Sequence, residues 1–572
     1  MINETEKYLC DVIKSLGYDI EKVNLVPSSR RELGDFQINE SFNLGKINHE
    51  NPRDIAEKIV SKLDNRFINV NIAGPGFINV SFNHDVLCDY LNKGINDFNI
   101  FVDKKDSKTI IVDYGGANAA KALHVGHMRS ANIGEALKRL AKLLGNNVIG
   151  DVHLGDLGRQ AGMLISEYKR MEPNSVFFDK DYKGEYPKIN LTAKDLGIMY
   201  PKASLDAKCD EKRIEEVREI TAEIDKGNKA YIELWKQMVD ISKEVIKKVY
   251  DKLNCHFELF EGELDAFKYI KETLEIMKPY LYESDGALVC DVEKNDDNKP
   301  MPPLLVIKSD GATIYATRDL ATIYSRVKRF NPNEIWYVVD ERQGLYFEQI
   351  FRASYKVGLV KEDTSLKHFG FGTINGADGK PYKTRDGGVM ELDTLINLIH
   401  DEVEKNIKEE IVGEERNRIA NTLSIATLKY ADLLPYRKTD YVFDPKKFAS
   451  LDGKTGPYVL YTLVRIKSLL KKSLDTDFSL INIENKEVLD ILVKTLEVNN
   501  ILNKSYEEAT LNYITEYIYD LLSLYNKFYN NNNILNEKDD DIRKTYLAVS
   551  KLVYNIVHNL LDVLAIDEVD RM

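Results

Sequence analysis

The sequence predicts an α/β protein in which a parallel sheet is preceded by a small α/β unit and followed by an all-α helical bundle. From Thr109 to about residue 375, short apolar runs typical of strands alternate with helical patterns, which favours a parallel sheet with helices on both faces. Beyond residue 390 the strand signals fade, and apolar residues recur at helical spacing. Because 572 residues are too many for one hydrophobic core, about two to four domains are expected.

Residues 1–85 show the mixed pattern of a small α/β unit. A helix is predicted to start at Asn51-Pro52-Arg53 and to run through 54–63, with Pro52 early in its first turn, where the missing N–H group costs nothing. Residues 73–80 (AGPGFINV) have the composition of a turn that leads into an alternating strand. The charged run at 103–108 indicates a linker to the next domain.

The central domain is predicted over residues 106–390. Runs of strand character follow the first strand at Thr109, at 147–152, 303–307, 334–339 and 367–374. Helices are suggested at 319–329 and in the charged stretch 211–253. The stretch 171–210 is polar and turn-rich, so an insertion on the sheet is placed near 171–250.

The C-terminal part is predicted to be helical. Stretches with apolar residues at helical spacing are 391–411, 414–433, 456–472, 486–502, 506–529 and 541–565. In the last stretch one face carries Tyr546, Val549, Val553, Ile556, Leu560 and Leu564. We interpret 391–449 as a helical stem or linker and 450–572 as a helical bundle domain.

Composition narrows the class of protein. Hydrophobic residues make up 43% of the chain and charged residues 30%, as in soluble globular proteins. No run of 18 or more apolar residues occurs, and the N-terminus lacks the basic start and apolar stretch of a signal peptide, so a cytoplasmic protein without a membrane partner is expected. The five cysteines form no CxxC pair, which speaks against a zinc ribbon or a disulfide framework. The net charge of −13 argues mildly against non-specific nucleic-acid binding but allows local basic patches.

The stretch 109–145 carries the strongest functional signal. A β-branched strand at 109–112 leads into the small-residue loop 115–118, where glycine allows sharp turns and close approach of a ligand. The following helix has one apolar face and a glycine at its end, formed by Ile133, Leu137, Leu140, Leu144 and Gly145. Strand, glycine loop and helix N-terminus hold phosphate groups in doubly wound, Rossmann-like proteins, so a nucleotide site is predicted.

Two histidines, His124 and His127, stand where this helix begins. Beside a glycine-rich loop they can donate hydrogen bonds to phosphate oxygens as charge develops there. Gly126 between them leaves space for a base or ribose. The structural alternative is a pair of helix-start histidines, one capping the helix and one packed against it.

The loop, Asn118, Lys121 and the His-Val-Gly-His sequence resemble the "HIGH" signature of class I aminoacyl-tRNA synthetases. The stretch is specifically similar to that of arginyl-tRNA synthetases of the bacterial type, and the resemblance covers nearly the whole chain. The matching signature comprises Ala117, Asn118, Ala119, Ala120, Lys121, Ala122, Leu123, His124, Val125, Gly126 and His127. Gly116 and Ala117 depart from the family's usual pair of a small residue and proline.

The resemblance places the mobile "KMSKS" loop, which closes over the ATP phosphates, at residues 379–388. It implies that phosphate charge is stabilised by Lys380, Lys383 and Arg385. Thr384 occupies the place of the loop's usual second lysine, and the family compensates with the lysine before the histidine motif, here Lys121. Without the resemblance, this Gly/Lys/Asp-rich loop is simply a solvated turn.

The family's arginine pocket matches this sequence at Asp113, Asn118, Tyr315, Asp319 and Gln343. A guanidinium has five donors in one plane and pairs best with carboxylates, with an aromatic face nearby. The alternatives are that Tyr315 belongs to the core and that Asp319 is the N-cap of the following helix. Tyr346 stands where related sequences often carry histidine.

The stretch 150–158 (GDVHLGDLG) is similar to the family's strand and loop beside the ATP site, although Arg159 and Ala161 differ from the usual threonine and phenylalanine. We interpret His153 as a residue that supports the loop, without a catalytic role. No protein-bound metal is predicted, because metal-like spacing is missing among His49, His84, His256, His368, His400 and His558.

Both ends of the chain imply tRNA as a partner. Residues 1–85 resemble the N-terminal domain that contacts the tRNA corner, and residues 450–572 resemble the helical anticodon-binding domain. Side chains suited to stacking on bases and meeting phosphates are Tyr458, Tyr461, Arg465, Lys467, Lys471 and Lys472. The alternative is that these tyrosines pack in the core and the lysines solvate a helix face.

The resemblance implies a two-step reaction with L-arginine, ATP with Mg²⁺ and tRNA(Arg) as substrates. The arginine carboxylate attacks the α-phosphate of ATP to give arginyl-adenylate and pyrophosphate, and a terminal ribose hydroxyl of the tRNA then takes the arginyl group. A monomer is expected, with adenylate formation dependent on tRNA. The alternatives are a small-molecule nucleotidyltransferase with the same histidine loop and a catalytically silent, RNA-binding paralogue.

Overall fold

The computed structural model of the chain describes residues 1–28, 30–376, 378–380, 390–473, 475 and 477–572. These residues form two compact units, which are treated separately below. The first unit comprises Met1–Asp103, Tyr461–Asn503 and Tyr517–Leu560, and the second comprises Lys104–Leu460, Lys504–Glu516 and Leu561–Met572. Among the described residues, no helix has both the length and the apolar character needed to cross a bilayer.

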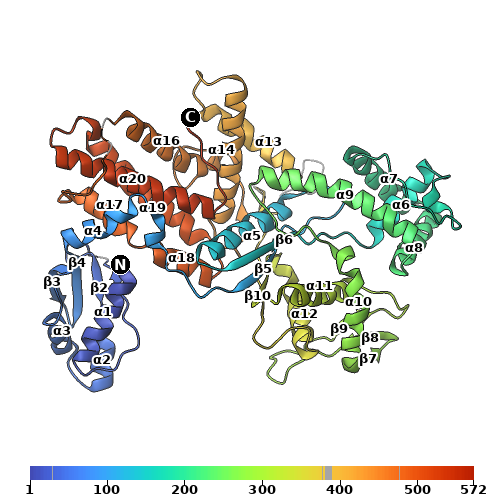
Figure 1. Cartoon of the computed structure of the whole chain (residues 1–572), viewed down its shortest axis with the longest axis horizontal. Helices are drawn as coiled ribbons and strands as arrows, with labels where there is room; N and C mark the ends of the chain where they lie inside the picture. The colour runs from blue at the N-terminus through green and yellow to red at the C-terminus, as the bar shows by residue number, and fades with distance from the viewer. Residues whose placement is uncertain (29, 377, 381–389, 474, 476) are drawn as a thin grey trace. The chain divides into compact units, whose positions relative to one another are not determined.

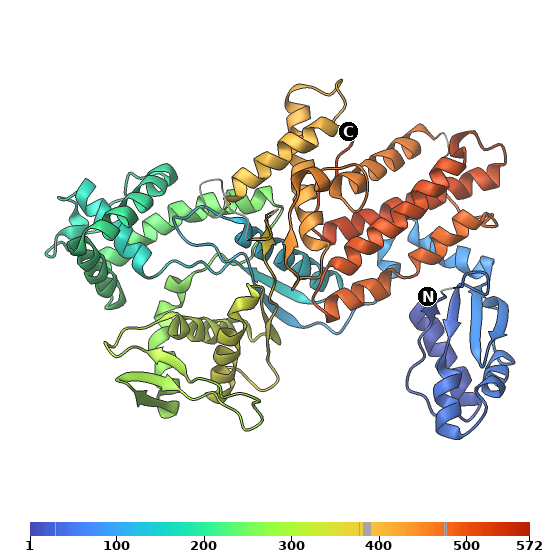
Figure 2. The same cartoon turned by 180° about the vertical axis from the view of Figure 1, so that it is seen from behind.

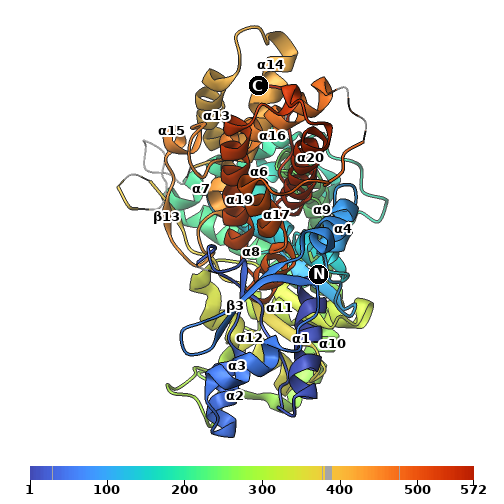
Figure 3. The ribbon, with the colours of Figure 1, turned by 90° about the vertical axis from the view of Figure 1, so that its left-hand side faces the viewer.

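The N-terminal part of the first unit is an antiparallel sheet with helices (Figure 3). Its elements are α1 (Ile2–Ser15), β1 (Val26–Pro27), β2 (Phe36–Ile38), α2 (Glu40–Asn48), α3 (Pro52–Val60), β3 (Phe67–Ala73), β4 (Phe77–Phe82) and α4 (His84–Gly94). The strand order is β1-β2-β4-β3. Pro52 is the first residue of α3, and the Asn51 side chain caps the helix by accepting from the Arg53 N–H, so this helix start is as predicted.

The C-terminal stretch is helical, which confirms the predicted bundle. Its helices are α16 (Gly456–Lys472), α17 (Lys486–Thr495), α18 (Val498–Glu507), α19 (Asn512–Asn531) and α20 (Asp540–Val563). Buried aromatic residues join α19 to α20 within the first unit: the rings of Phe528 and Tyr546 lie edge to face with centroids 5.1 Å apart.

The second unit is organised around a parallel sheet, as the alternating pattern predicted (Figure 1). Its strands are β5 (Thr109–Asp113), β6 (Asn147–Asp151), β10 (Glu334–Tyr337) and β11 (Ser365–His368), in the order β11-β10-β5-β6. All neighbouring pairs are parallel, and Asp113 pairs in register with both Tyr337 and Asp151. The carboxyl ends of three strands therefore meet at one edge of the sheet.

Helices follow or cover these strands. They are α5 (Val125–Leu143), α10 (Glu263–Met277), α11 (Tyr315–Phe330), α12 (Gly344–Lys356), α13 (Leu392–Val403), α14 (Gly413–Leu433) and α15 (Pro445–Phe448). The helix α5 has the predicted apolar face, and Gly145, which follows the C-cap residue Leu144, has a φ of +98°, the conformation of a glycine at a helix end.

Two predicted strands belong elsewhere than in the parallel sheet. The run at 303–307 forms β9 (Leu304–Ile307), which pairs antiparallel with β8 (Ala287–Cys290) in a separate three-stranded sheet. On its other side β8 pairs antiparallel with β7 (Leu281–Ser284). The turn between β7 and β8 is Asp285-Gly286, both with positive φ, which is the geometry that a two-residue hairpin prefers. This pair of residues is a sequence signal for a hairpin, and the hairpin gives β9 an antiparallel partner.

The run at 367–374 is interrupted. Its second half is β12 (Ile374–Asn375), which pairs with β13 (Tyr441–Val442) and not with the central sheet. A Cβ atom on Gly372 would lie 2.6 Å from Asp440 Oδ1 and 2.7 Å from the Lys438 carbonyl oxygen, so only glycine fits between β11 and β12.

The insertion is helical throughout much of its length. It contains α6 (Arg159–Met171), α7 (Ala193–Cys209), α8 (Glu211–Asp225) and α9 (Lys229–Lys252), which pack against one another (Figures 1 and 2). The stretch predicted to be turn-rich includes α7, which starts with a capping box between Thr192 and Asp195. The stretch 211–253 is divided at Gly227-Asn228, where Gly227 has a φ of +87°.

Candidate active site

The loop between β5 and α5 lies at a topological switch point. The chain runs from β5 through α5 to β6 on one side, while β10 lies on the other side, and such points form ligand crevices in α/β sheets. Gly115 and Gly116 have φ values of +89° and +44°, so the loop needs glycine at both positions. The Gly115 N–H donates to Ser130 Oγ in α5 (2.8 Å), and the Ser130 hydroxyl donates to the Val338 carbonyl after β10 (2.6 Å). These bonds hold the loop between helix and sheet.

The second half of this loop pairs with the segment that follows β6. Asn118 and Gly155 form a parallel bridge, in which the Gly155 N–H donates to the Ala117 carbonyl at 3.0 Å. A Cβ atom on Gly155 would lie 2.7 Å from Asn118 Oδ1, so glycine is required for Asn118 to occupy this place. Ala120 has a φ of +56°, and its N–H donates to Ser242 Oγ in α9 at 3.1 Å.

The two histidines form the start of α5. His124 is the N-cap: its Nδ1 accepts from the Gly126 N–H at 3.1 Å, and its own N–H donates to His127 Nδ1 at 3.2 Å. The rings stack with centroids 3.7 Å apart. A Cβ atom on Gly126 would lie 3.0 Å from the His124 ring, so this glycine serves the capping contact. The structural alternative, in which one histidine caps the helix and the other packs against it, therefore describes the local geometry.

These contacts also define what the histidines can donate. Burial lowers the pKa of His124 and lowers the pKa of His127 to about 3, and the nearby Lys121 ammonium acts in the same direction. Both rings are therefore neutral at pH 7. Because each Nδ1 accepts a hydrogen bond, the ring proton is on Nε2, which leaves two neutral N–H donors at the helix N-terminus.

The segment after the predicted phosphate loop is tied to the histidine motif. The Val125 N–H donates to the Met390 carbonyl at 3.3 Å, and the Leu392 N–H donates to the Leu123 carbonyl at 2.9 Å. Of the loop's predicted residues, Lys380 is described and exposed. Lys383, Thr384 and Arg385 lie outside the described residues.

A cavity of about 290 Å³ brings part of the predicted site together. Asn118, Lys121 and Tyr315 line it. Tyr315 is 64% exposed, so the alternative that it belongs to the core is wrong. Arg159, noted above as a departure from the family pattern, also lines the cavity. Residues that the sequence did not single out line it as well, namely Gln160, Tyr200, Ser204, Lys208 and Glu263. Gln160 Nε2 is buried without a hydrogen-bond partner among the described residues, which suits a site that binds a polar ligand.

Glu263 supplies a carboxylate to this cavity. It is the first residue of α10, and its side chain is 8% exposed. Burial raises its pKa to about 7, although Arg318 Nη1 lies 2.9 Å away and acts in the opposite direction. Nothing in the local sequence indicates that Glu263 lines the cavity, because its place there depends on how α10 packs against the loop after β6.

The insertion contributes a wall of the cavity through α7. Tyr200, Ser204 and Lys208 are spaced four residues apart, so they lie on one face of that helix. The Lys121 Nζ lies 5.2 Å from the centroid of the Tyr200 ring, a cation–π distance.

Asp113 is bound by an internal guanidinium. Arg326 Nη2 lies 2.7 Å from Asp113 Oδ2 and 2.6 Å from Asp151 Oδ2, and all three side chains are buried. Asp113 thus stands at the carboxyl end of β5, as predicted, with one oxygen paired to Arg326. Its contact with substrate arginine stays a prediction.

Asp319 lies inside α11, because this helix begins at Tyr315 with Ile314 as the N-cap. The N-cap alternative for Asp319 is therefore wrong. Tyr346, which stands where related sequences often carry histidine, donates its hydroxyl hydrogen to Asp319 Oδ2. Burial raises the pKa of Asp319, while the nearby His153 opposes this shift. Gln343 is exposed and is not among the residues that line the cavity.

His153 lies among carboxylates next to the cavity. It has a φ of +24°, and both ring nitrogens are buried without a hydrogen-bond partner among the described residues. Burial lowers its pKa, but the carboxylates of Asp113, Asp151 and Asp319 outweigh that effect and raise it. Grouped metal ligands, three or more His, Cys, Asp or Glu side chains, are not found in the part of the chain that the structure describes.

The predicted tRNA-binding side chains lie on α16. The Arg465 guanidinium lies between the rings of Tyr461 and Tyr529, 5.1 and 5.0 Å from their centroids, and donates to Asn526 Oδ1 at 2.9 Å. Tyr458 and Lys467 are half-buried. Arg465 therefore takes part in packing, and its role toward tRNA stays a prediction.

Comparison with known families covers the chain in three segments. Residues 3–82 match the Arginyl tRNA synthetase N terminal domain, residues 93–445 match tRNA synthetases class I (R), catalytic domain, and residues 459–572 match the DALR anticodon binding domain. Arginine--tRNA ligase from Alkaliphilus oremlandii (strain OhILAs) is 41% identical, and that from Agathobacter rectalis is 40% identical. Each of these alignments covers 100% of both chains.

Solved structures share the fold. The arginyl-tRNA synthetase from Plasmodium falciparum superposes with a TM-score of 0.82 at 23% identity, covering 100% of this chain and 99% of that one. The Thermus thermophilus arginyl-tRNA synthetase gives a TM-score of 0.78 at 18% identity, covering 100% of both chains. The chain therefore belongs to the arginyl-tRNA synthetase family, a class I aminoacyl-tRNA synthetase family of arginine–tRNA ligases.

Proposed function

We propose that the cavity beside the histidine motif is where this arginine–tRNA ligase binds and activates arginine. The observation that carries the proposal is that Asn118, Lys121, Glu263 and Tyr315 line one cavity at the switch point of the sheet. The substrates are L-arginine, ATP, which brings Mg²⁺ with it, and tRNA(Arg). A silent RNA-binding paralogue would not need these groups.

The arginine side chain binds among carboxylates. Glu263 in the cavity wall accepts from the guanidinium, the exposed ring of Tyr315 lies against its plane, and Asn118 completes the donor and acceptor set. The buried Asp319, which does not line the cavity, is assigned as a second acceptor by the family motif. Tyr346 orients Asp319 through its hydroxyl group. Asp113 is paired with Arg326 at the carboxyl end of β5. Asp113 and Gln343 do not line the cavity and are assigned to the arginine site by the family motif.

Activation of arginine needs no covalent intermediate with a side chain. The Nε2 donors of His124 and His127 stabilise phosphate charge as the arginine carboxylate attacks the α-phosphate of ATP, and the Lys121 ammonium neutralises the departing pyrophosphate. Gly126 keeps the helix start free for ATP. The loop that carries Lys380, Lys383 and Arg385 adds cations, and its far end is tied to the histidine motif at Met390.

The remaining assignments concern the whole chain. Residues 1–85 bind the tRNA corner, 106–390 form the catalytic domain, 391–449 form the stem and 450–572 bind the anticodon. Within the last of these, tRNA is contacted by Tyr458, Tyr461, Arg465 and Lys467. The enzyme is a cytoplasmic monomer, consistent with translation as its process.

The arginine pocket is tested by Asp319→Asn. Because this change removes one charge-assisted pair, worth roughly 1.5–3 kcal/mol, the KM for arginine should rise by roughly 10- to 100-fold. The measurement is arginine-dependent ATP–pyrophosphate exchange in the presence of tRNA. Tyr346→Phe, which removes only the orienting hydroxyl, should raise the KM less, and an unchanged KM in Asp319→Asn would show that Asp319 does not bind the guanidinium.

A further inference from the structure

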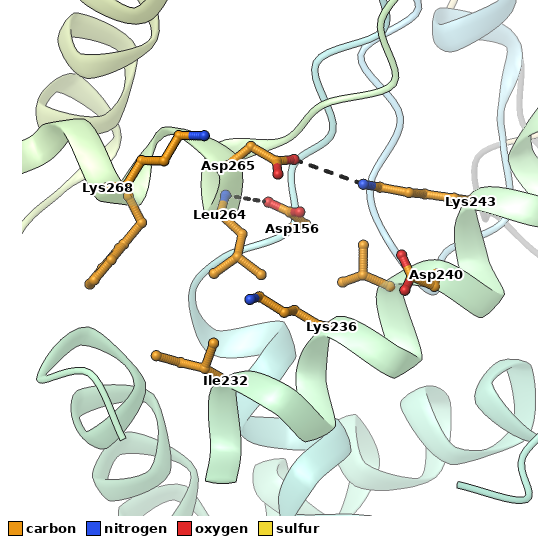
Figure 4. A pocket seen from close by; sticks show the side chains of 10 residues that line it. Asp156, Ile232, Lys236, Asp240, Lys243, Leu264, Asp265 and Lys268 are labelled. Carbon is orange, nitrogen blue, oxygen red and sulfur yellow. Dashed lines mark hydrogen bonds and ion pairs between the residues drawn. The ribbon is translucent and has the colours of Figure 1, made fainter. Parts of the chain in front are cut away.

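A second cavity, of about 410 Å³, lies between α9 and the first turns of α10 (Figure 4). Figure 4 shows Lys243 directed toward Asp265, and these two side chains form an ion pair at 3.8 Å. The charged side chains of the lining are three lysines and three aspartates, namely Lys236, Lys243, Lys268, Asp156, Asp240 and Asp265. Because the charges of these described residues balance, the cavity offers a ligand no excess of either sign, and we assign it none.

A buried guanidinium lies directly behind the histidine motif. Arg129 belongs to α5, two residues after His127, and is 1% exposed. Its Nη1 donates to the carbonyl oxygens of Thr373 and Thr439, at 3.3 and 3.2 Å. Its Nη2 donates to those of Arg437 and Thr439, at 3.0 and 3.2 Å. One side chain of α5 therefore binds the main chain of both segments that enter the β12–β13 pair.

The charge of Arg129 is balanced by Asp432 in α14. Arg129 Nε lies 3.4 Å from Asp432 Oδ1, and both side chains are buried. Asp432 also accepts from Asn132 Nδ2 of α5 and from the Tyr441 hydroxyl of β13, each at 3.0 Å. A buried ion pair is weak evidence for stability, because desolvation of the two charges offsets their attraction. Its hydrogen bonds do, however, give the bonded segments a fixed place against α5.

The same helix also holds the chain on the far side of the predicted phosphate loop, residues 379–388. The loop follows β12 and precedes Met390, whose carbonyl accepts from the Val125 N–H at 3.3 Å. His124 and Glu391 form an antiparallel bridge. Helix α5 is thus bonded to the chain before the loop through Arg129 and to the chain after the loop through its first residues.

We propose that Arg129 is a positioning residue, which fixes the strand that enters the phosphate loop relative to His124 and His127. This rests on the proposed function, in which the histidines and the loop act on the same phosphates. Arginine suits this task, because its planar guanidinium donates in several directions at once, whereas a lysine ammonium is a single point charge. Arg129 touches no substrate in this account and acts only through the segments that it bonds.

The first experiment replaces Arg129 with lysine, which keeps a positive charge beside Asp432 but cannot reach all three carbonyl groups. Because a displacement of about 1 Å can cost about 100-fold in rate, Arg129→Lys should lower kcat of arginine-dependent pyrophosphate exchange by about ten- to hundredfold. The KM for arginine should not change, because Arg129 does not line the arginine cavity. An unchanged kcat, or a loss that appears equally in the KM for arginine, would overturn the proposal.

Arg139→Lys is the matched control. Arg139 lies on the same helix, pairs with Glu135 and Asp562, and donates to the Asn254 carbonyl at 3.1 Å. None of these described partners belongs to β12 or β13. Arg139→Lys should therefore keep the wild-type kcat, and an equal loss in both variants would show that a guanidinium in α5 serves only the stability of the helix.

Asp440 gives a test that does not disturb the buried pair. It is exposed, and its Oδ1 accepts from the Thr373 N–H at 2.6 Å, in the same residue whose carbonyl Arg129 binds. Asp440→Ala should lower kcat of pyrophosphate exchange about two- to tenfold, the range of one hydrogen bond, while Asp440→Asn keeps an acceptor oxygen and should restore it. The wild-type kcat in Asp440→Ala would contradict the claim that the place of this strand sets the rate.

The second step of the reaction separates positioning of the loop from general damage. Transfer of arginine from chemically synthesised arginyl-adenylate to tRNA releases no pyrophosphate, so Arg129→Lys should transfer at the wild-type rate. Equal losses in both steps would overturn the positioning role. If the wild-type enzyme itself showed no arginine-dependent exchange, the proposed function would be wrong, whereas exchange of equal kcat in wild type and Arg129→Lys would count only against the role of Arg129.

Discussion

Glu263 and the two histidines show how burial decides the chemistry of single residues in this site. The histidines are neutral donors because burial lowers their pKa values, whereas burial raises the pKa of Glu263 to about 7. Burial also raises the pKa of Asp319, and the Tyr346 hydroxyl donates one hydrogen bond to that carboxylate. The site therefore holds neutral N–H groups for phosphate and carboxyl groups for a guanidinium.

The raised pKa of Glu263 predicts a pH dependence of arginine use. An acid with a pKa of about 7 is a carboxylate above that pH and neutral below it, and the neutral form cannot make a charge-assisted pair. We expect kcat/KM for arginine to fall about tenfold per pH unit below about pH 7, because kcat/KM reports ionisations of the free enzyme. Pyrophosphate exchange between pH 5.5 and 8.5 at constant ionic strength measures it.

Glu263→Gln is the matched variant for this pH profile, because it keeps the shape of the side chain without its ionisation. It should lower kcat/KM at pH 8 and remove the fall near pH 7. A profile that keeps the same inflection in Glu263→Gln would assign the ionisation to another group.

At this scale the sequence identified the residues that carry family motifs. Asn118, Lys121 and Tyr315 line the cavity as their motifs indicated. Glu263 and Tyr200 were missed, because their place in the cavity depends on packing between elements far apart in the chain. The internal pairing of Asp113 with Arg326 was missed for the same reason, since 213 positions separate them.

At the scale of elements, α7 changes the interpretation of the insertion. Its polar sequence suggested turns, yet the capping box of Thr192 and Asp195 starts a helix that supplies Tyr200 to the active-site cavity. The Lys121 Nζ lies 5.2 Å from the centroid of the Tyr200 ring, and Lys121 is the cation that we propose replaces the missing loop lysine. Through this one aromatic contact the insertion would support the proposed role of Lys121.

This contact predicts a coupling that a double-mutant cycle can measure. Tyr200→Leu should lower kcat of pyrophosphate exchange by about two- to thirtyfold, the range of a cation–π contact, while Tyr200→Phe keeps the ring and stays near wild type. In a Lys121→Met background, Tyr200→Leu should have little further effect. Equal losses in both backgrounds would mean that Tyr200 supports the fold and does not act through Lys121.

Helices and strands with a strong apolar pattern of their own were predicted correctly. The pairing of a strand with its neighbours, which depends on distant segments, was not. The strands β5, β6 and β10 and the helices α5 and α11 lie where apolar periodicity placed them. Which strand pairs with which is a tertiary property, so β9 was assigned to the parallel sheet although its partner is β8. The sequence signal for the hairpin between β7 and β8 was the Asp285-Gly286 turn, which is only two residues long.

At the scale of the whole molecule, the second unit is completed by residues from the end of the chain. The Tyr430 hydroxyl in α14 donates to the Thr515 carbonyl, and Arg437 Nε donates to the Ala509 carbonyl at 2.9 Å. Arg571 also pairs with Glu415. Sequence patterns place helices in this region but do not reveal that segments 504–516 and 561–572 belong to the unit that holds the catalytic sheet.

The central claim is that this chain activates arginine at the cavity beside its histidine motif, with tRNA present. Its most direct test is ATP–pyrophosphate exchange by the full-length enzyme, with and without arginine and with and without cognate tRNA. We predict exchange that depends on arginine, requires tRNA, and is abolished by replacing His127 with alanine. Absence of arginine-dependent exchange in the presence of tRNA would contradict the claim.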